Sequence, residues 1–248
     1  MITGASALAA YAALPRRAIA DNSRLLTHHA AAAAPTQVMT WDQAGAVAAG
    51  ITSGIAAFST THVANDTITK ISGSQGPTVI GLSSIDVTKK LYWEVKLLTN
   101  AGGSGGFMLL GLATQANTSY IGNYGSGNVG IAHSSDGGRY RGGTDRPPET
   151  LSDSGPTLLT GDSFCFACDG SNSGKLHWRM NNSSMWYGIG ADGVTDNPVT
   201  GIGGWNGGAA YGGTMFPAIS LFDVGDSACI VAGSNLSYPI PTGYTAVA

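Results

Sequence analysis

From residue 39 onward, the chain is a succession of short apolar and β-branched runs separated by Gly, Asn, Asp and Pro residues. These turn-forming residues recur about every 8–12 residues, and no helical pattern longer than about ten residues follows residue 40. The spacing predicts roughly ten to thirteen short strands, which is typical of an all-β sandwich. The sequence shows no internal repeat, and this disfavours a propeller or a β-solenoid.

The strongest strand prediction covers residues 89–99, followed by an apolar run at 107–114 that is typical of a strand covered on both faces. Residues 163–168 and 175–180 are predicted to form a hairpin across the loop 169–174. Because side chains alternate between the faces of a strand, residues 89–99 present two sets. The first set is Leu91, Trp93, Val95 and Leu97, and the second is Tyr92, Glu94, Lys96 and Leu98.

Prolines and glycines predict where strands are interrupted. Residues 145–157 contain three prolines among Ser and Asp residues and are predicted to form a loop. Pro217 lies inside the apolar run 215–222, and this predicts an edge strand or a bulge, because proline has no N–H to donate. Residues 188–213 are rich in glycine and are predicted to form a loop.

Residues 1–37 differ from the rest and are predicted to form an assembly arm and linker, followed by a sandwich domain at 38–248. Ala-rich stretches and Pro15 predict two short helices, which bury too little surface to be stable alone. Arg16 and Arg17 follow the apolar stretch, whereas a signal peptide carries its basic residues before it. The residues expected to contact the assembly are Leu8, Tyr11, Leu14, Leu25 and Leu26.

The chain is poor in charge, with 12 Lys+Arg and 15 Asp+Glu among its 248 residues, and rich in glycine, with 37. Its aromatic content disfavours disorder, and its irregular glycines exclude collagen. A net charge of −3 provides no basic surface for nucleic acid. No apolar run reaches the roughly 18 residues of a membrane span, so no membrane span is expected.

Cys165 and Cys168 are three residues apart on a predicted strand, so their side chains are expected on opposite faces. This spacing disfavours a redox or zinc interpretation of the pair, and no second pair completes a zinc site. The favoured interpretation is buried free thiols in a protein made in a reducing cytoplasm.

The order of six motifs resembles the SPRY (B30.2-like) domain over about residues 40–246. These motifs are residues 90–95, 110–113, 161–169, 174–182, 216–221 and 230–233, and a closing segment at 238–244 is similar to that of phage and bacterial members. Two departures are Asn182, where the family's hairpin usually has Gly, and the Gly-rich insertion at 188–213.

The resemblance implies a bent sandwich of two antiparallel sheets, similar to concanavalin, with a binding face built from loops. It also implies a binding module rather than an enzyme. Members with a short Ala-rich arm resemble structural proteins of tailed bacteriophages.

Several carboxylates and histidines are candidates for catalysis or metal binding, but structural roles are favoured for them. A glycosidase needs two carboxylates across a groove, and the candidates are Glu94, Asp136, Asp145, Glu149, Asp162 and Asp169. For Glu94 the favoured interpretation is pairing with Lys96 or Arg179. His133 and His177 have no spaced partner for a metal. The loop 169–174 could hold calcium, but Asx turns are favoured because it lacks a closing Glu.

Aromatic and basic residues on the predicted loops are the candidate ligand- or partner-binding residues. They are Tyr120, Tyr124, Arg139, Tyr140, Arg141, Trp205, Asn206 and Tyr211. Aromatic rings on Gly/Asn-rich loops can stack on sugars or anchor a protein partner. For Trp205 a place at the end of the sandwich core stays open. Trp93 and Trp178 are assigned to the core.

These observations predict a non-enzymatic virion structural protein, made in the host cytoplasm and requiring no cofactor or metal. It would be a capsid decoration or head fibre protein, or a tail-fibre or spike component. The arm would dock on other virion proteins, and the sandwich would contact the host surface or neighbouring subunits in a homo-oligomer. The alternative is a carbohydrate-binding module of a secreted or surface bacterial protein, and a glycoside-active enzyme is a third possibility.

Overall fold

The computed structural model describes most of the chain from Met39 to Val247. The described residues are 39–51, 55–59, 66–73, 76–86, 88–102, 108–121, 130–134, 139–143, 146–151, 157–172, 174–187, 196–206 and 214–247. The predicted arm lies outside these residues, as do Tyr124 and Tyr211.

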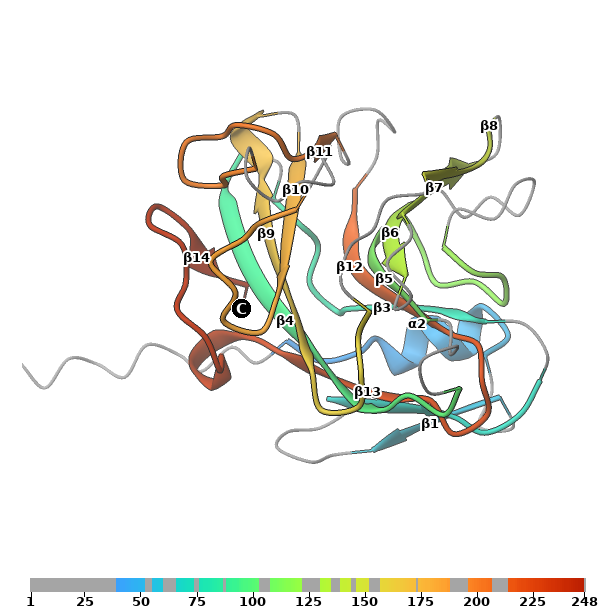
Figure 1. Cartoon of the computed structure of the whole chain (residues 1–248). Helices are drawn as coiled ribbons and strands as arrows, with labels where there is room; N and C mark the ends of the chain where they lie inside the picture. The colour runs from blue at the N-terminus through green and yellow to red at the C-terminus, as the bar shows by residue number, and fades with distance from the viewer. Residues whose placement is uncertain are drawn as a thin grey trace, which may run out of the picture. The chain divides into compact units, whose positions relative to one another are not determined.

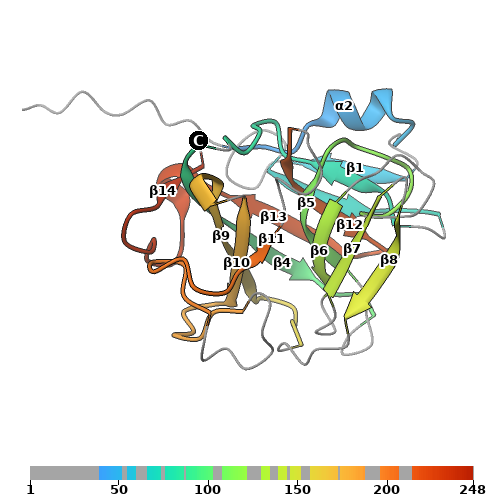
Figure 2. The same cartoon turned by 90° about the horizontal axis from the view of Figure 1, so that it is seen from above.

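Two β-sheets form the two layers of a sandwich (Figures 1 and 2). In spatial order, the first sheet consists of β1 (Ala56–Ser59), β2 (Thr67–Lys70), β13 (Ser227–Val231), β4 (Lys90–Thr99), β9 (Ser163–Asp169), β10 (Lys175–Met180) and β11 (Trp205–Asn206). A short strand, β14 (Thr245–Ala246), runs parallel to β4, and all other pairs in this sheet are antiparallel.

The second sheet is antiparallel throughout the described residues. Its spatial order is β3 (Thr78–Ile80), β12 (Phe216–Leu221), β5 (Met108–Ala113), β6 (Gly130–Ser134), β7 (Arg139–Gly143) and β8 (Arg146–Leu151). The helical elements are α2 (Gln43–Ala48) and the single 3₁₀ turns η2 (Gly170–Asn172) and η4 (Gly233–Asn235). The predicted all-β sandwich is thereby confirmed.

The main core lies between the sheets and contains the side chains that the alternation in β4 predicted. Leu91, Trp93, Val95 and Leu97 all belong to it, whereas Tyr92 lies in a separate apolar cluster on the opposite face. All six residues of β5 are buried, as expected for a strand covered on both faces. Trp93 and Trp178 are core residues, as assigned from the sequence, and stack on Phe166 and Phe164 respectively.

The prediction of a loop at 145–157 is wrong for residues 146–151, which form β8. Within the described part of the chain, β8 is the edge strand of its sheet and pairs with β7 alone, so its other edge needs no N–H donors. The ladder also shifts register between Arg141 and Gly143, opposite Pro147 and Pro148. An edge position and an irregular register are the two settings in which a strand tolerates proline.

The prediction of an edge strand or bulge at Pro217 is also wrong, since β12 lies between β3 and β5 in regular register. The Pro217 carbonyl accepts a hydrogen bond from the Gly81 N–H at 2.7 Å, just beyond the last residue of β3. The nitrogen and the carbonyl of a strand residue point to the same side of the strand. The Pro217 nitrogen, which carries no hydrogen, therefore points toward Gly81, where β3 has already ended. An interior strand therefore accommodates the proline without losing a bond of the β3 ladder.

The three cysteines are buried free thiols, as the spacing of Cys165 and Cys168 predicted. Cys168 faces the main core, and Cys165 faces the cluster on the opposite side of the sheet. Burial is the largest cause that raises the pKa of each thiol, Cys229 included, to about 12.

Because only the thiolate is nucleophilic, the folded protein is expected to react negligibly with a disulfide reagent near about pH 8. All 3 thiols are expected to react after denaturation. A colorimetric thiol titration, with and without guanidinium chloride, measures this difference. Rapid titration of the native protein would contradict the burial of these side chains.

Candidate functional site

Among the described residues, the short helix α2 has a hollow on each side of it. Asp42 caps the helix, since its Oδ1 accepts a hydrogen bond from the Gly45 N–H at 2.9 Å. A Cβ at position 45 would collide with the Asp42 carboxylate, so glycine permits this cap. Ala46 packs into the main core and anchors the helix, and Val47 is 52% exposed.

The chain that leads into α2 covers the outer edge of β3. The Leu82 N–H donates to the Thr40 carbonyl, and the Asp42 N–H donates to the Ile80 carbonyl, both at 2.8 Å. Farther along the same edge, the backbones of Thr78 and Asn117 bond to each other in both directions, at 2.7 and 3.0 Å. These bonds hold α2 and the loop after β5 against one end of the sandwich.

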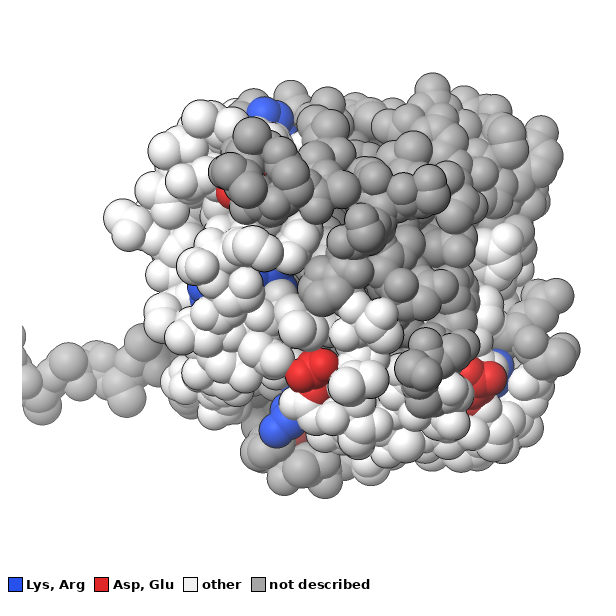
Figure 3. Space-filling view, viewed as in Figure 1, with Lys and Arg blue, Asp and Glu red and all other residues white. Residues whose placement is uncertain are grey.

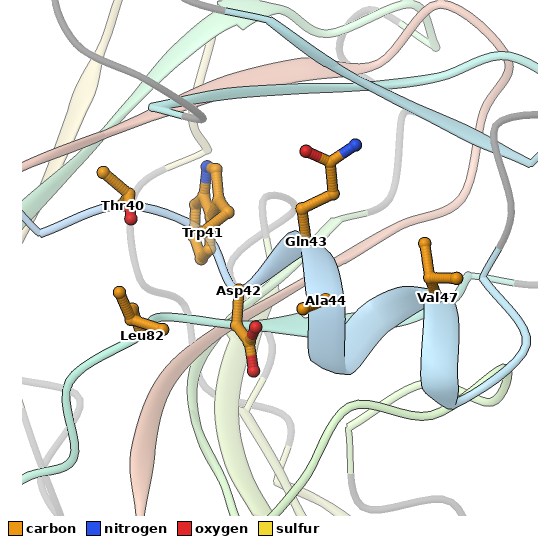
Figure 4. Close-up of a pocket in the computed structure, with 7 residues that line it drawn as sticks. All are labelled: Thr40, Trp41, Asp42, Gln43, Ala44, Val47 and Leu82. Atoms are coloured by element: carbon orange, nitrogen blue, oxygen red, sulfur yellow. The ribbon is translucent and has the colours of Figure 1, made fainter.

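The first hollow has a volume of about 570 Å³ and lies beside the N-terminal half of α2 (Figure 4). Its described lining residues are Thr40, Trp41, Asp42, Gln43, Ala44, Val47 and Leu82. In Figure 4 the Asp42 carboxylate lies on the opposite side of the helix from the side chains of Trp41 and Gln43. Leu82, which is 63% exposed, is the most exposed large apolar residue of the described chain.

The second hollow has a volume of about 680 Å³ and lies between the C-terminal end of α2 and the loop after β5. Its described lining residues are Gly45, Ala48, Ala49, Ile80, Thr114, Gln115, Ala116, Asn117, Thr118 and Phe216. None of these residues carries a formal charge. Ile80, Ala116 and Phe216 belong to the apolar cluster on the outer face of the second sheet.

The ligand- or partner-binding residues predicted from the sequence do not appear among the described lining residues of either hollow. Tyr120 is half-buried and lies against Phe222, with ring centroids 5.7 Å apart. Arg139, Tyr140 and Arg141 lie on β7, an interior strand of its sheet, rather than on a loop.

The prediction that the glycine-rich loop presents Trp205 and Asn206 is wrong for the backbone of both residues. They form β11, which pairs with Leu176 and Lys175 of β10 and extends the first sheet. Strand pairing holds this backbone in place, whereas a presented loop would leave it unpaired.

Sequence reasoning missed α2 because six residues are too few for helical periodicity to be visible. The available signal was Asp42, a preferred N-cap residue directly before an Ala-rich stretch.

Glu94 is not paired with Lys96 or Arg179, and the sequence-based interpretation is corrected here. Its carboxylate is 0% exposed and accepts hydrogen bonds from the Tyr92 hydroxyl and from the N–H groups of Ser237 and Tyr238, each at 2.9 Å. It therefore fastens the C-terminal segment to the outer face of β4. Arg179 instead donates to the Pro239 carbonyl at 2.8 Å and lies over the Trp186 ring.

The other described carboxylate candidates also have structural partners. Asp162 accepts from Asn181 Nδ2 and from the Leu159 N–H, at 2.9 and 2.8 Å. Asp169 forms an ion pair with Lys90 at 3.0 Å and accepts from the Ser171 hydroxyl at 2.6 Å, at the start of the loop considered for calcium. Asp136 and Asp145 lie outside the described residues, and the side chain of Glu149 is not described.

Among the described side chains, no group of three or more His, Cys, Asp or Glu residues is arranged to hold a metal ion. In the same part of the chain, no helix is both long and apolar enough to cross a membrane.

On the face shown in Figure 3, the described surface consists mostly of uncharged residues, with a few Lys, Arg, Asp and Glu side chains between them. The two hollows follow this pattern, since Asp42 is the one formally charged residue among their described lining. A ligand of either hollow would therefore meet mainly neutral groups.

No protein-family model matches this chain, and no curated protein matches it. Several solved structures are similar to it. The SPRY domain of human HERC1 is 14% identical, with a TM-score of 0.45, and the match covers 69% of this chain and 90% of that one. A second human SPRY domain is 16% identical, with a TM-score of 0.42 and coverage of 68% and 92%.

The TRIM65 PSpry domain is 15% identical, with a TM-score of 0.46 and coverage of 78% and 92%. These neighbours are of the same kind as the domain that the sequence motifs resemble. The likeness concerns the β-sandwich fold.

Proposed function

We propose that this chain is a non-enzymatic structural protein of a bacteriophage virion, in which the first hollow receives a neighbouring virion subunit. It would be a capsid decoration or head fibre protein, or a tail-fibre or spike component, made in the host cytoplasm. The observation that carries the proposal is the pair of exposed apolar residues, Val47 and Leu82, beside a hollow of about 570 Å³. Exposed apolar groups gathered around a hollow favour a protein partner, because its apolar side chains would lose their contact with water there.

The structural use of the carboxylates supports a binding role rather than catalysis. Glu94 is buried under hydrogen bonds from the C-terminal segment, and Asp162 and Asp169 hold turns. A glycosidase requires two carboxylates that face a groove, and none of these three lines a described hollow.

The virion context is supported by the sequence. The Ala-rich residues 1–37 suit an arm that is covered by other subunits, and the closing motif resembles that of phage members. A neutral surface suits a protein that works outside the cell, because its contacts depend little on salt.

Detection in purified particles tests the proposal. The full-length protein is expected to co-purify with gradient-purified virions from the source strain, and removal of residues 1–37 is expected to abolish its incorporation. Replacing Leu82 with Asp places a charge at the first hollow and is expected to lower incorporation at least tenfold.

The matched control for this variant is Leu159→Asp, because Leu159 is also an exposed leucine, at 53%, and lies away from both hollows. It is expected to be incorporated like the wild-type protein. Absence of the wild-type protein from particles, or equal incorporation of the two Asp variants, would contradict the proposal.

The carbohydrate-binding alternative is favoured by one specific observation: none of the described residues that line the second hollow is charged.

A further inference from the structure

We infer that the second hollow, between the end of α2 and the loop at 114–118, is a binding site for a neutral saccharide. The inference deepens the carbohydrate-binding alternative given under the proposed function, because it specifies the class of ligand and the place where it binds. It rests only on the part of that proposal in which the chain is a binding protein.

The lining of the hollow selects against charged ligands. All ten described lining residues are uncharged, so none of these ten offers a cation to a phosphate, a sulfated sugar or an acidic peptide. Removing an ionic ligand from water without a partner is costly. A ligand that fits this lining is polar but neutral.

The floor of the hollow is apolar and includes an aromatic ring. Ile80 is 6% exposed, and Phe216 is half-buried beside it on the outer face of the second sheet. Ala48, Ala49 and Gly45 supply the facing wall from α2 without large side chains. A partly exposed aromatic residue next to small residues suits the apolar C–H face of a sugar ring, which is buried by contact with it.

The rim of the hollow carries groups that match sugar hydroxyls. Gln115 and Asn117 provide side-chain amides, and Thr114 and Thr118 provide hydroxyls. Amides and hydroxyls can both donate and accept hydrogen bonds, as can each hydroxyl of a saccharide. The rim therefore matches the chemistry of a polyol better than that of an apolar peptide segment.

The rim is also held in place before any ligand arrives. The Asn117 backbone bonds in both directions to Thr78 on β3, and Asn117 Oδ1 accepts from the Ser119 N–H at 2.9 Å. Thr78 in turn donates its hydroxyl to the Ser119 carbonyl at 2.7 Å. The rim backbone at Asn117 therefore loses little conformational entropy on binding, and this favours affinity.

The volume of about 680 Å³ lies within the range of about 300–1,000 Å³ that is usual for small-ligand sites. It suits a ligand of one or two sugar rings rather than a long oligosaccharide chain.

The test is a glycan array that carries neutral and acidic glycans, probed with the full chain and followed by titration of the best neutral glycan. Wild-type protein is expected to bind a neutral glycan. Ala48→Trp fills the hollow from an exposed helix position and is expected to weaken binding at least tenfold. Leu159→Trp adds the same side chain at an exposed position outside the hollow and is expected to bind like the wild type.

A second variant keeps the test valid if Ala48→Trp does not fold, as judged from its thermal unfolding. Gln115→Ala combined with Thr118→Ala removes two exposed rim side chains and is expected to weaken binding at least tenfold. Three outcomes would overturn the inference: no binding to any neutral glycan, binding confined to acidic glycans, or equal binding by wild type and both hollow variants.

Failure of this inference is distinguishable from failure of the virion role. Ala48→Trp leaves the first hollow intact, so its incorporation into particles reports on the virion role alone. A protein that enters virions but binds no neutral glycan refutes the saccharide site only, and a glycan-binding protein absent from virions refutes the virion role only.

Discussion

Replacing Glu94 with alanine is expected to lower the free energy of unfolding by about 4 kcal/mol, because it removes three hydrogen bonds to a carboxylate, and a hydrogen bond to a charged group contributes about 1.5–3 kcal/mol. The carboxylate is the acceptor for three donors, the Tyr92 hydroxyl and the N–H groups of Ser237 and Tyr238. Equilibrium unfolding in urea measures the change. Hydrogen exchange is expected to accelerate at the amides of residues 237 and 238.

The control for this variant is Asp86→Ala. Asp86 is an exposed carboxylate that bonds to Thr88 and pairs with Lys89 at 3.2 Å. Exposed pairs contribute little to stability, so this variant is expected to lose only a small part of what Glu94→Ala loses. Similar losses in the two variants, or unchanged exchange at 237 and 238, would contradict the role assigned to Glu94.

Acidification from pH 7 to pH 4 is expected to destabilise the protein through one buried histidine on β10. His177 is 0% exposed, and its pKa is lowered from 6.5 to about 4, mainly by burial and then by the charge of Lys175. The Lys90 charge acts in the same direction, and the Asp169 carboxylate opposes both. Because the folded-state pKa is the lower one, the unfolded state binds more protons below pH 6.5.

The neutral His177 ring therefore makes its full contribution to the free energy of unfolding above about pH 6.5, and this contribution is lost as the pH falls toward 4. At about 1.4 kcal/mol per pKa unit, the lowered pKa corresponds to a loss of about 3 kcal/mol. The backbone of Gly204, which lies against the His177 ring, supports this loss of stability at low pH. A Cβ added at Gly204 would lie 2.5 Å from Nε2, so a hydrated imidazolium has no room on that side.

His177→Leu separates this histidine from the carboxylates that also titrate in acid. Among the described residues, neither ring nitrogen of His177 has a hydrogen-bond partner, so leucine leaves no donor or acceptor unpaired there. Urea unfolding at several pH values is expected to show that the wild type loses about 3 kcal/mol more than the variant between pH 7 and 4. If the free energy of unfolding falls by the same amount in both proteins between pH 7 and 4, protonation of His177 does not destabilise the fold and the prediction is wrong.

The strand pattern of the sandwich could be predicted because it depends on local chemistry. The two faces of β4 follow from alternation, the burial of β5 follows from its unbroken apolar run, and the hairpin of β9 and β10 follows from the turn residues between them. The same alternation placed Cys165 and Cys168 on opposite faces.

The prolines show that the sequence around a residue does not always predict whether that residue lies in a strand or at which place in the sheet. Proline restricts a strand through its missing N–H, and the cost depends on what lies opposite that nitrogen. Pro147 and Pro148 are accommodated because β8 is an edge strand with a register shift, and Pro217 because β3 ends beside it. Neither neighbour can be read from the residues adjacent to these prolines in the chain.

The sequence by itself determined the β class, the main strands and the faces of those strands, because period-two alternation and turn residues act over a few positions. The tertiary structure decided what each polar residue is used for. Glu94 bonds to the backbone of residues more than 140 positions away, and the hollows beside α2 combine a short helix with loops from distant parts of the chain. Such neighbours are set by how the two sheets and the C-terminal segment pack, because hydrogen bonds and hollows depend on proximity in space rather than along the chain.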